Sequence, residues 1–134
     1  MSPPQSEPLD PYLAVRAFHE RFGVAVADRP RLPDEGVREL RIRLLREEAE
    51  EAAAALAGVS LADIAQELAD LLYVTYGTAV SLGIDIRPVF AAVHAANMAK
   101  VGGGTRADGK VLKPPGWRPP DVRAVLAAQM AGNP

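Results

Sequence analysis

The chain has 134 residues, a length typical of one domain, and no cysteine, which excludes disulfides, thiolate metal ligands and a cysteine nucleophile. Hydrophobic residues make up 49% and charged residues 24% of the sequence, as in ordinary globular proteins, and the net charge of -2 argues against a general nucleic-acid binder. Alanine is abundant and aromatic residues reach only 5%, so the composition favours closely packed helices over sheets.

The sequence shows no sign of a membrane or secreted protein. No apolar run approaches the ~20 residues of a membrane span, and the first residues do not resemble a signal peptide. We therefore expect a soluble, cytoplasmic, all-α protein without nucleic-acid or membrane partners.

The predicted elements are helices with recognisable ends. Asp10 followed by Pro11 is typical of a helix start, because Asp caps free N–H groups and Pro suits the first helical position. Ser60 with Asp63 resembles a capping box, with Asp in place of Glu. Glycines after the periodic segments indicate helix ends. These signals predict helices over residues 11–23, 34–56, 60–82, 85–101 and 121–130.

Two segments lie outside these helices. Residues 1–9 are rich in Pro and Ser and are expected to be flexible, which leaves a single helical domain over residues 10–131. Residues 102–120 form a long loop, and loops of this length in compact domains usually have a function. We expect a mobile lid, with freedom from the three glycines at its start and positive charge from Arg106, Lys110 and Lys113.

Acidic residues interrupt the apolar stripe of the helix predicted over 34–56. On a helical wheel centred on Leu44, Glu48 and Glu51 fall in the middle of the apolar positions and Glu47 falls on their edge. A solvated acidic face explains Glu50, which points away from the stripe, but fits Glu48 and Glu51 poorly.

The next helix repeats this pattern. Glu67 lies among apolar positions and Asp70 lies beside it, so four acids could converge where the two helices pack. Clustered carboxylates away from water are unfavourable unless a cation neutralises them, and hard oxygen ligands suit Mg²⁺ or Mn²⁺. The alternative, a surface seam of acids paired with arginines, stays open from geometry alone; its arginines would be Arg41, Arg43 and Arg46.

The fourth predicted helix carries polar groups on its apolar side. Asn97 lies among apolar positions and Lys100 is adjacent, while His94 is less well placed and is expected to be structural or partly exposed. Alone, each has a structural explanation: a buried hydrogen-bonded Asn, and a lysine that snorkels to the surface. Together they could hold phosphate oxygens.

Several other classes of enzyme do not fit. Neither histidine, His19 or His94, follows a Glu at the spacing that di-iron bundles use. The sequence has no G-x-S-x-G motif, which disfavours a triad hydrolase, and no Gly-Lys-Ser/Thr follows the glycines at 102–104, which disfavours a Walker A loop. Metal-dependent chemistry on a phosphate ester remains.

The acids match a known signature. Residues 45–51 (L-R-E-E-A-E-E) and 67–72 (E-L-A-D-L-L) resemble the E-E-x-x-E…E-x-x-D signature of the MazG-like, all-α nucleoside triphosphate pyrophosphohydrolases. This superfamily also includes dimeric dUTPases and phosphoribosyl-ATP pyrophosphohydrolases, and the resemblance implies its four-helix-bundle-like fold. Supporting similarity extends over residues 18–23, 28–30, 94–100 and 106–113.

The resemblance implies Mg²⁺-dependent cleavage between the α- and β-phosphates of a nucleotide, with Mn²⁺ as a possible substitute. Glu47 would be a further metal ligand or the catalytic base. Asn97 and Lys100 would hold the triphosphate, helped by Arg106, Lys110 and Lys113. The metal ligands implied by position are Glu48, Glu51, Glu67 and Asp70.

The resemblance also implies a homodimer or homotetramer and a nucleoside triphosphate substrate, such as dUTP or a non-standard nucleotide removed in nucleotide-pool sanitation. The alternatives are the phosphoribosyl-ATP pyrophosphohydrolase of histidine synthesis and a non-enzymatic helical dimerisation module. Phe18, His19 and Phe22 could line a base pocket, although an amphipathic core helix explains the two phenylalanines equally well.

Overall fold

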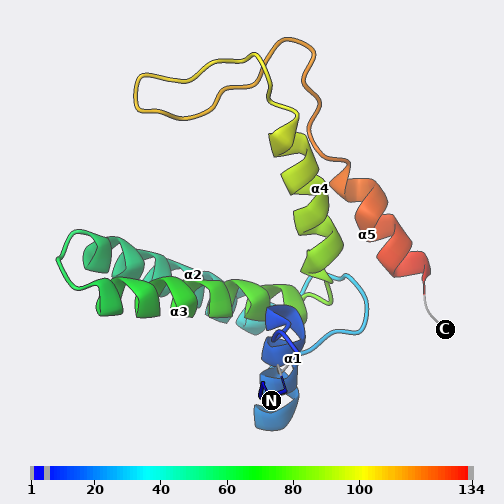
Figure 1. Cartoon of the computed structure of the whole chain (residues 1–134). Helices are drawn as coiled ribbons and strands as arrows, with labels where there is room; N and C mark the ends of the chain where they lie inside the picture. The colour runs from blue at the N-terminus through cyan, green and yellow to red at the C-terminus, as the bar shows by residue number, and fades with distance from the viewer. Residues whose placement is uncertain (1, 5–6, 133–134) are drawn as a thin grey trace. The chain divides into compact units, whose positions relative to one another are not determined.

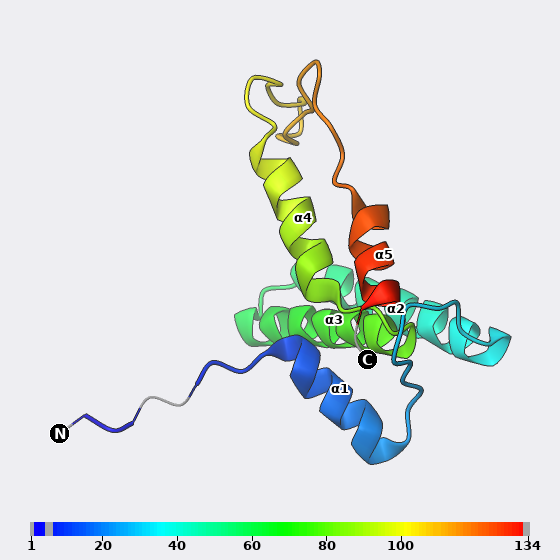
Figure 2. The same cartoon turned by 90° about the vertical axis from the view of Figure 1, so that its right-hand side faces the viewer.

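The computed structural model of the chain describes residues 2–4 and 7–132 (Figures 1 and 2). Within these residues the regular elements are helices, and the predicted all-α class is confirmed. The helices are α1 (Pro11–Phe22), α2 (Glu35–Leu56), α3 (Leu61–Ser81), α4 (Ile86–Met98) and α5 (Val122–Ala131).

The chain divides into two compact units, unit 1 over Met1–Ile84 and unit 2 over Asp85–Pro134. The single domain predicted over residues 10–131 stays a prediction. The segment predicted to be flexible, residues 1–9, lies partly outside the described residues. No single helix within the described part is long and apolar enough to cross a membrane, although α3 and α4 counted together would reach that length and hydropathy.

The caps predicted from the sequence are present. The Asp10 carboxylate accepts a hydrogen bond from the Leu13 N–H at 3.0 Å, and the Ser60 hydroxyl accepts one from the Asp63 N–H at 3.2 Å. Helix α4 ends at Met98, three residues before the predicted end, because the chain tightens into a turn in which the Lys100 N–H bonds to the Asn97 carbonyl at 3.1 Å.

In unit 1, α2 and α3 lie side by side and α1 packs on α3 (Figures 1 and 2). The connection after α1 is hydrogen-bonded to the end of α3, where the Ser81 hydroxyl donates to the Ala25 carbonyl at 2.9 Å. Gly83 has a φ of 70°, and a Cβ there would run into the Arg29 carbonyl, so this close crossing requires glycine. The buried apolar side chains of unit 1 are Tyr12, Val15, Ala52, Ala79 and Val80.

The buried stripe of α2 is rotated from its predicted position, towards Arg41. Arg41 is only 5% exposed, whereas Leu40, an apolar residue on the other side of Leu44 on the wheel, is 41% exposed. The Arg41 guanidinium donates to the Val74 carbonyl at 2.8 Å and to the Thr78 hydroxyl at 3.1 Å. The surface seam that included Arg41 is therefore wrong at this position: these α3 oxygens allow the cation to be buried, and burial lowers its pKa.

Gly77 of α3 makes room for two polar side chains. A Cβ at this position would lie 2.6 Å from Nη2 of Arg41 and 2.9 Å from Nε2 of His19. His19 is 3% exposed, and its Nδ1 lies 3.0 Å from the Ala25 carbonyl oxygen. His19 of α1 therefore contacts both the connection that follows α1, at Ala25, and α3, at Gly77.

This arrangement predicts an acid-sensitive fold. Burial lowers the pKa of His19 below its ordinary value of 6.5; the hydrogen bond with Ala25 opposes this shift, and the Arg41 charge adds to it. The unfolded chain therefore takes up the proton more readily, so the free energy of unfolding should fall as the pH drops below about 6.5. Chemical denaturation between about pH 5 and 8 measures this slope.

The other histidine supplies the control. His94 is exposed, so His94→Gln should keep the wild-type pH slope. His19→Gln should be less stable at neutral pH, by about 1–3 kcal/mol for a disturbed buried hydrogen bond, and its slope should be flatter. An unchanged slope in His19→Gln would assign the acid sensitivity to another group.

In unit 2, α4 and α5 lie side by side in opposite directions (Figures 1 and 2). The Gln129 side chain joins them, since its Oε1 accepts from the Asp85 N–H and its Nε2 donates to the Asp85 carbonyl, both at 2.9 Å.

The long loop of unit 2 is shaped like a hairpin. Thr105 and Val111 form an isolated antiparallel bridge, and the Leu112 N–H bonds to the Gly104 carbonyl at 3.0 Å. A Cβ at Gly103 would run into the Leu112 carbonyl. The initial glycines, expected to give freedom, are thus used at least partly to let two backbone segments approach closely.

Candidate functional site

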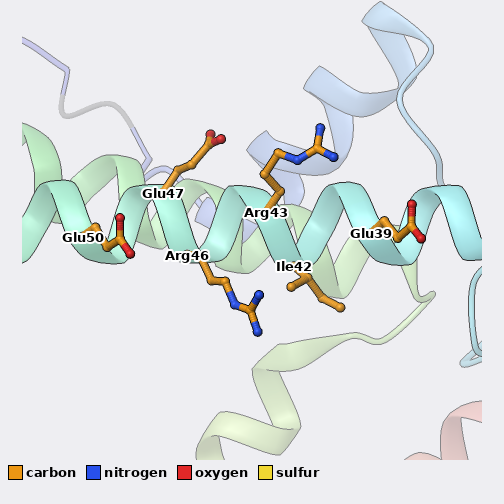
Figure 3. A pocket seen from close by; sticks show the side chains of 6 residues that line it. All are labelled: Glu39, Ile42, Arg43, Arg46, Glu47 and Glu50. Carbon is orange, nitrogen blue, oxygen red and sulfur yellow. The ribbon is translucent and has the colours of Figure 1, made fainter.

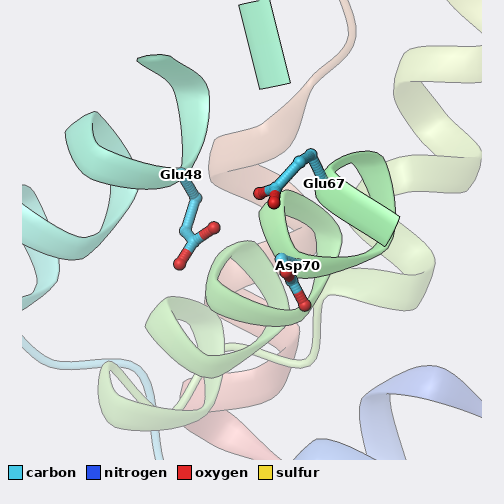
Figure 4. A group of neighbouring side chains, drawn as sticks. All are labelled: Glu48, Glu67 and Asp70. Carbon is cyan, nitrogen blue, oxygen red and sulfur yellow. The ribbon is translucent and has the colours of Figure 1, made fainter. Parts of the chain in front are cut away.

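Three acids from facing helices of unit 1 converge (Figure 4). Glu48 comes from α2, while Glu67 and Asp70 lie one turn apart on α3 and share a face. One carboxylate oxygen of each residue lies within 4.8 Å of the others, and all three side chains are half-buried. This spacing allows the three oxygens to bind one cation. Glu48, Glu67 and Asp70 are called the acid cluster below.

The cluster lacks compensating positive charge within the described residues. One oxygen of Glu48 and one of Glu67 are buried without a hydrogen-bond donor. Loss of hydration raises the pKa of both carboxyl groups, and the charges of Glu51 and Asp70 raise them further. Two ionised carboxylates cannot donate to each other, so a bound cation is the direct way to satisfy these oxygens at neutral pH.

The other two predicted acids of α2 lie differently. Glu51 is exposed, yet it is near enough to act on both Glu48 and Glu67. Glu47 is exposed and outside the acid cluster; it belongs to a charged surface of α2 alone (Figure 3). That surface is lined by Glu39, Ile42, Arg43, Arg46, Glu47 and Glu50. The roles of Glu51 as a ligand and Glu47 as a base stay predictions.

An open groove adjoins the acid cluster, with a volume of about 510 Å³. Glu51 and Glu67 line it, together with the small residues Ala54, Ala55 and Gly58. The groove lies where α2 turns into α3, so a ligand in it would contact the carboxylates from that end of the hairpin.

The predicted phosphate-binding residues belong to unit 2. Asn97 and Lys110 are exposed. Arg106 is engaged within the loop: its guanidinium binds Asp108 through two contacts of 2.8 and 2.6 Å, and this pairing lowers the pKa of Asp108. Phosphate binding by Arg106 would require this ion pair to open. The phosphate-binding role of each stays a prediction.

Lys100 and Lys113 share one aromatic partner. The Lys100 Nζ lies 5.4 Å and the Lys113 Nζ 4.9 Å from the centre of the Trp117 ring. Sequence reasoning did not assign Trp117 to the site. Its position near Lys113 in the sequence was visible, but its packing on the end of α4 depends on how the loop folds.

The three residues suggested for a base pocket differ in exposure: His19 is buried, whereas Phe18 and Phe22 are exposed. The His19 side chain is hydrogen-bonded and has almost no exposed surface that a ligand could contact. The tilted rings of Phe18 and Phe22 lie 4.8 Å apart between centres. Tyr73 of α3 packs edge-on against Phe18 at 5.5 Å. A base-binding role for the phenylalanines stays a prediction.

Comparison with protein families agrees with this geometry. A family model described as phosphoribosyl-ATP pyrophosphohydrolase matches residues 15–97, which include all of the acid cluster. The protein is thus one of the MazG-like, all-α nucleoside triphosphate pyrophosphohydrolases, as the resemblance implied. Within that superfamily, the chain belongs to the phosphoribosyl-ATP pyrophosphohydrolase family. A search of curated proteins found no match.

Family membership distinguishes the predicted enzyme from the alternative of a non-enzymatic dimerisation module. The protein is a pyrophosphohydrolase, a hydrolase acting on phosphorus anhydrides. The non-enzymatic dimerisation module is not supported. The family is typically metal-dependent, in agreement with the acid cluster.

Proposed function

We propose that the protein uses a divalent cation, Mg²⁺ or Mn²⁺, to cleave the α–β phosphate bond of a nucleotide, releasing a monophosphate and pyrophosphate. The observation that carries the proposal is the acid cluster, in which three half-buried carboxylates converge and two buried oxygens lack a donor. These oxygen donors are the kind that hard divalent cations prefer.

The acid cluster would hold the cation, with Glu51 as a further ligand from its exposed position. When bound, such a cation neutralises phosphate charge and lowers the pKa of a water molecule at the site. The helices contribute rigidity, since Glu48 is fixed by α2, and Glu67 and Asp70 by α3. Asn97, Lys100 and Lys113 would bind phosphate oxygens, and Glu47 would act as base.

Two substrates are candidates. The first is a nucleoside triphosphate such as dUTP or a non-standard nucleotide, removed to keep the nucleotide pool clean. The second is phosphoribosyl-ATP, an intermediate of histidine synthesis, which the description of the matching family favours. Both carry a triphosphate, so the same carboxylates and lysines would serve either one.

A panel of substrates tests this proposal. The purified protein with Mg²⁺ should release pyrophosphate from dUTP, dCTP, a non-standard triphosphate or phosphoribosyl-ATP, and the best substrate separates the two candidates. In ¹⁸O-water the label should enter the monophosphate, because water attacks the α-phosphorus. Label in orthophosphate, with a nucleoside diphosphate as the other product, would mean cleavage of the terminal phosphate and would contradict the proposal.

We further propose that the protein is a homodimer or homotetramer. Unit 1 leaves Leu61, Leu68 and Leu72 of α3 exposed, and contiguous exposed apolar side chains are typical of interaction surfaces. Light scattering gives the mass in solution, and the mass of a single chain at micromolar concentration would contradict this assembly.

A further inference from the structure

Unit 2 brings two cations, Lys100 and Lys113, to one indole ring, that of Trp117. Both ammonium groups lie about 5 Å from the centre of the Trp117 ring. Within residues 2–4 and 7–132, neither lysine forms an ion pair, whereas Arg106 in the same loop is paired with Asp108. The ring attracts each cation, but the two positive charges repel each other. This arrangement therefore favours a ligand with several negative charges.

The fold holds the ring in place from two sides. The Trp117 Nε1–H donates to the Ala96 carbonyl of α4 at 2.6 Å, so the indole lies against the turn that leads to Lys100. A tight turn brings Trp117 back near Lys113, four positions earlier in the chain: the Trp117 N–H bonds to the Pro114 carbonyl at 3.1 Å, and Gly116 has a φ of 79°. The helix supplies one lysine, the loop supplies the other, and Trp117 joins them.

We propose that Trp117 is a positioning residue that holds Lys100 and Lys113 as a binding site for the polyphosphate group of the substrate. The identity of the ligand rests on the proposed function. The two ammonium groups lie no further apart than the sum of their distances to the ring centre, and a di- or triphosphate can reach both. Trp117 acts through the lysines, so its loss should weaken substrate binding more than it slows the chemical step.

Direct binding is the first test, and it needs neither metal nor turnover. Trp117 is the only tryptophan, so its fluorescence should change and saturate when inorganic tripolyphosphate is added to the whole protein without Mg²⁺. Lys113→Gln should weaken this binding, whereas Arg118→Gln, which removes an exposed charge beside Trp117, should leave it unchanged. Equal weakening by both variants would mean general charge attraction and would overturn the proposal.

Kinetics provide the second test. Trp117→Leu should raise KM roughly five- to thirtyfold, the combined effect of two exposed cation–π contacts, with kcat within about twofold of wild type. Trp117→Phe keeps an aromatic face without the N–H and should recover part of this loss. Calorimetry with tripolyphosphate should show the same order of affinities. An unchanged KM and tripolyphosphate affinity in folded Trp117→Leu would overturn the proposal.

The tests also separate this proposal from the proposed function. A protein that binds tripolyphosphate through Lys113 but cleaves no nucleotide would support the lysine site and contradict the activity. Normal turnover of nucleotide, with KM and tripolyphosphate affinity unchanged in Trp117→Leu, would support the activity and contradict the lysine site. If Trp117→Leu does not fold, as its circular dichroism would show, calorimetric titrations of Trp117→Phe and Lys113→Gln with tripolyphosphate still decide the outcome.

Discussion

Replacing Glu48 by glutamine should lower kcat more than about 100-fold, beyond the 10- to 100-fold typical of losing a residue that merely supports a metal ligand. The change removes one charged ligand and keeps the size of the side chain, so the metal-free protein should stay folded. Loss of hydration and then nearby like charges raise the pKa of Glu48. Removing its charge relieves both unfavourable effects, so the melting temperature without metal should hold or rise.

Glu50→Gln is the matched control for this experiment. Glu50 lies on the same helix but on its exposed surface, outside the acid cluster (Figure 3). It should keep wild-type turnover. Steady-state kinetics and thermal unfolding of both variants give the comparison. If Glu48→Gln and Glu50→Gln have similar kcat, the acid cluster is not the reaction centre.

Divalent cations should stabilise the folded protein strongly. A ligand that binds only the folded state adds about 2.7 kcal/mol at a free concentration one hundred times its Kd, so Mg²⁺ or Mn²⁺ should raise the melting temperature by several degrees. The effect should be largest at neutral pH, where the carboxylates of the cluster are ionised and bind metal. Scanning calorimetry with added Mg²⁺, and again after chelation with EDTA, measures the shift.

The same two variants test whether the cation stabilises the protein by binding at the acid cluster. Glu48→Gln should lose most of the shift, while Glu50→Gln should keep it, since general screening by salt would affect both variants alike. A wild-type melting temperature that does not respond to Mg²⁺, with no heat of binding in the presence of nucleotide, would show that the acids do not form a metal site.

Local sequence signals were sufficient to predict most helix boundaries. Caps at Asp10 and Ser60 depend on neighbouring residues only, and both are present. The helical wheel also identified Glu48 and Glu67 as acids on the packed side of their helices, because the spacing of a helix fixes which residues share a face.

Features that depend on distant residues were missed. Burial of Arg41 requires the Val74 carbonyl and the space above Gly77, and neither is visible from the periodicity of α2. A charged residue is expected on the outside of a helix, so a stripe drawn through the apolar residues around Leu44 lies too far from Arg41. The contact of Trp117 with α4 likewise needs a loop to fold back over many residues. One missed contact is local: the mobile lid predicted over residues 102–120 did not include the pairing of Arg106 with Asp108, two residues further on.

The placement of aromatic residues gives each unit its own optical reporter. The single tryptophan, Trp117, belongs to unit 2, whereas all three tyrosines, Tyr12, Tyr73 and Tyr76, belong to unit 1. Tryptophan emission and tyrosine absorbance therefore follow the melting of separate parts of one unlabelled chain. Coincident denaturation curves would show that the units unfold as one cooperative system, and displaced curves would give each unit a stability of its own.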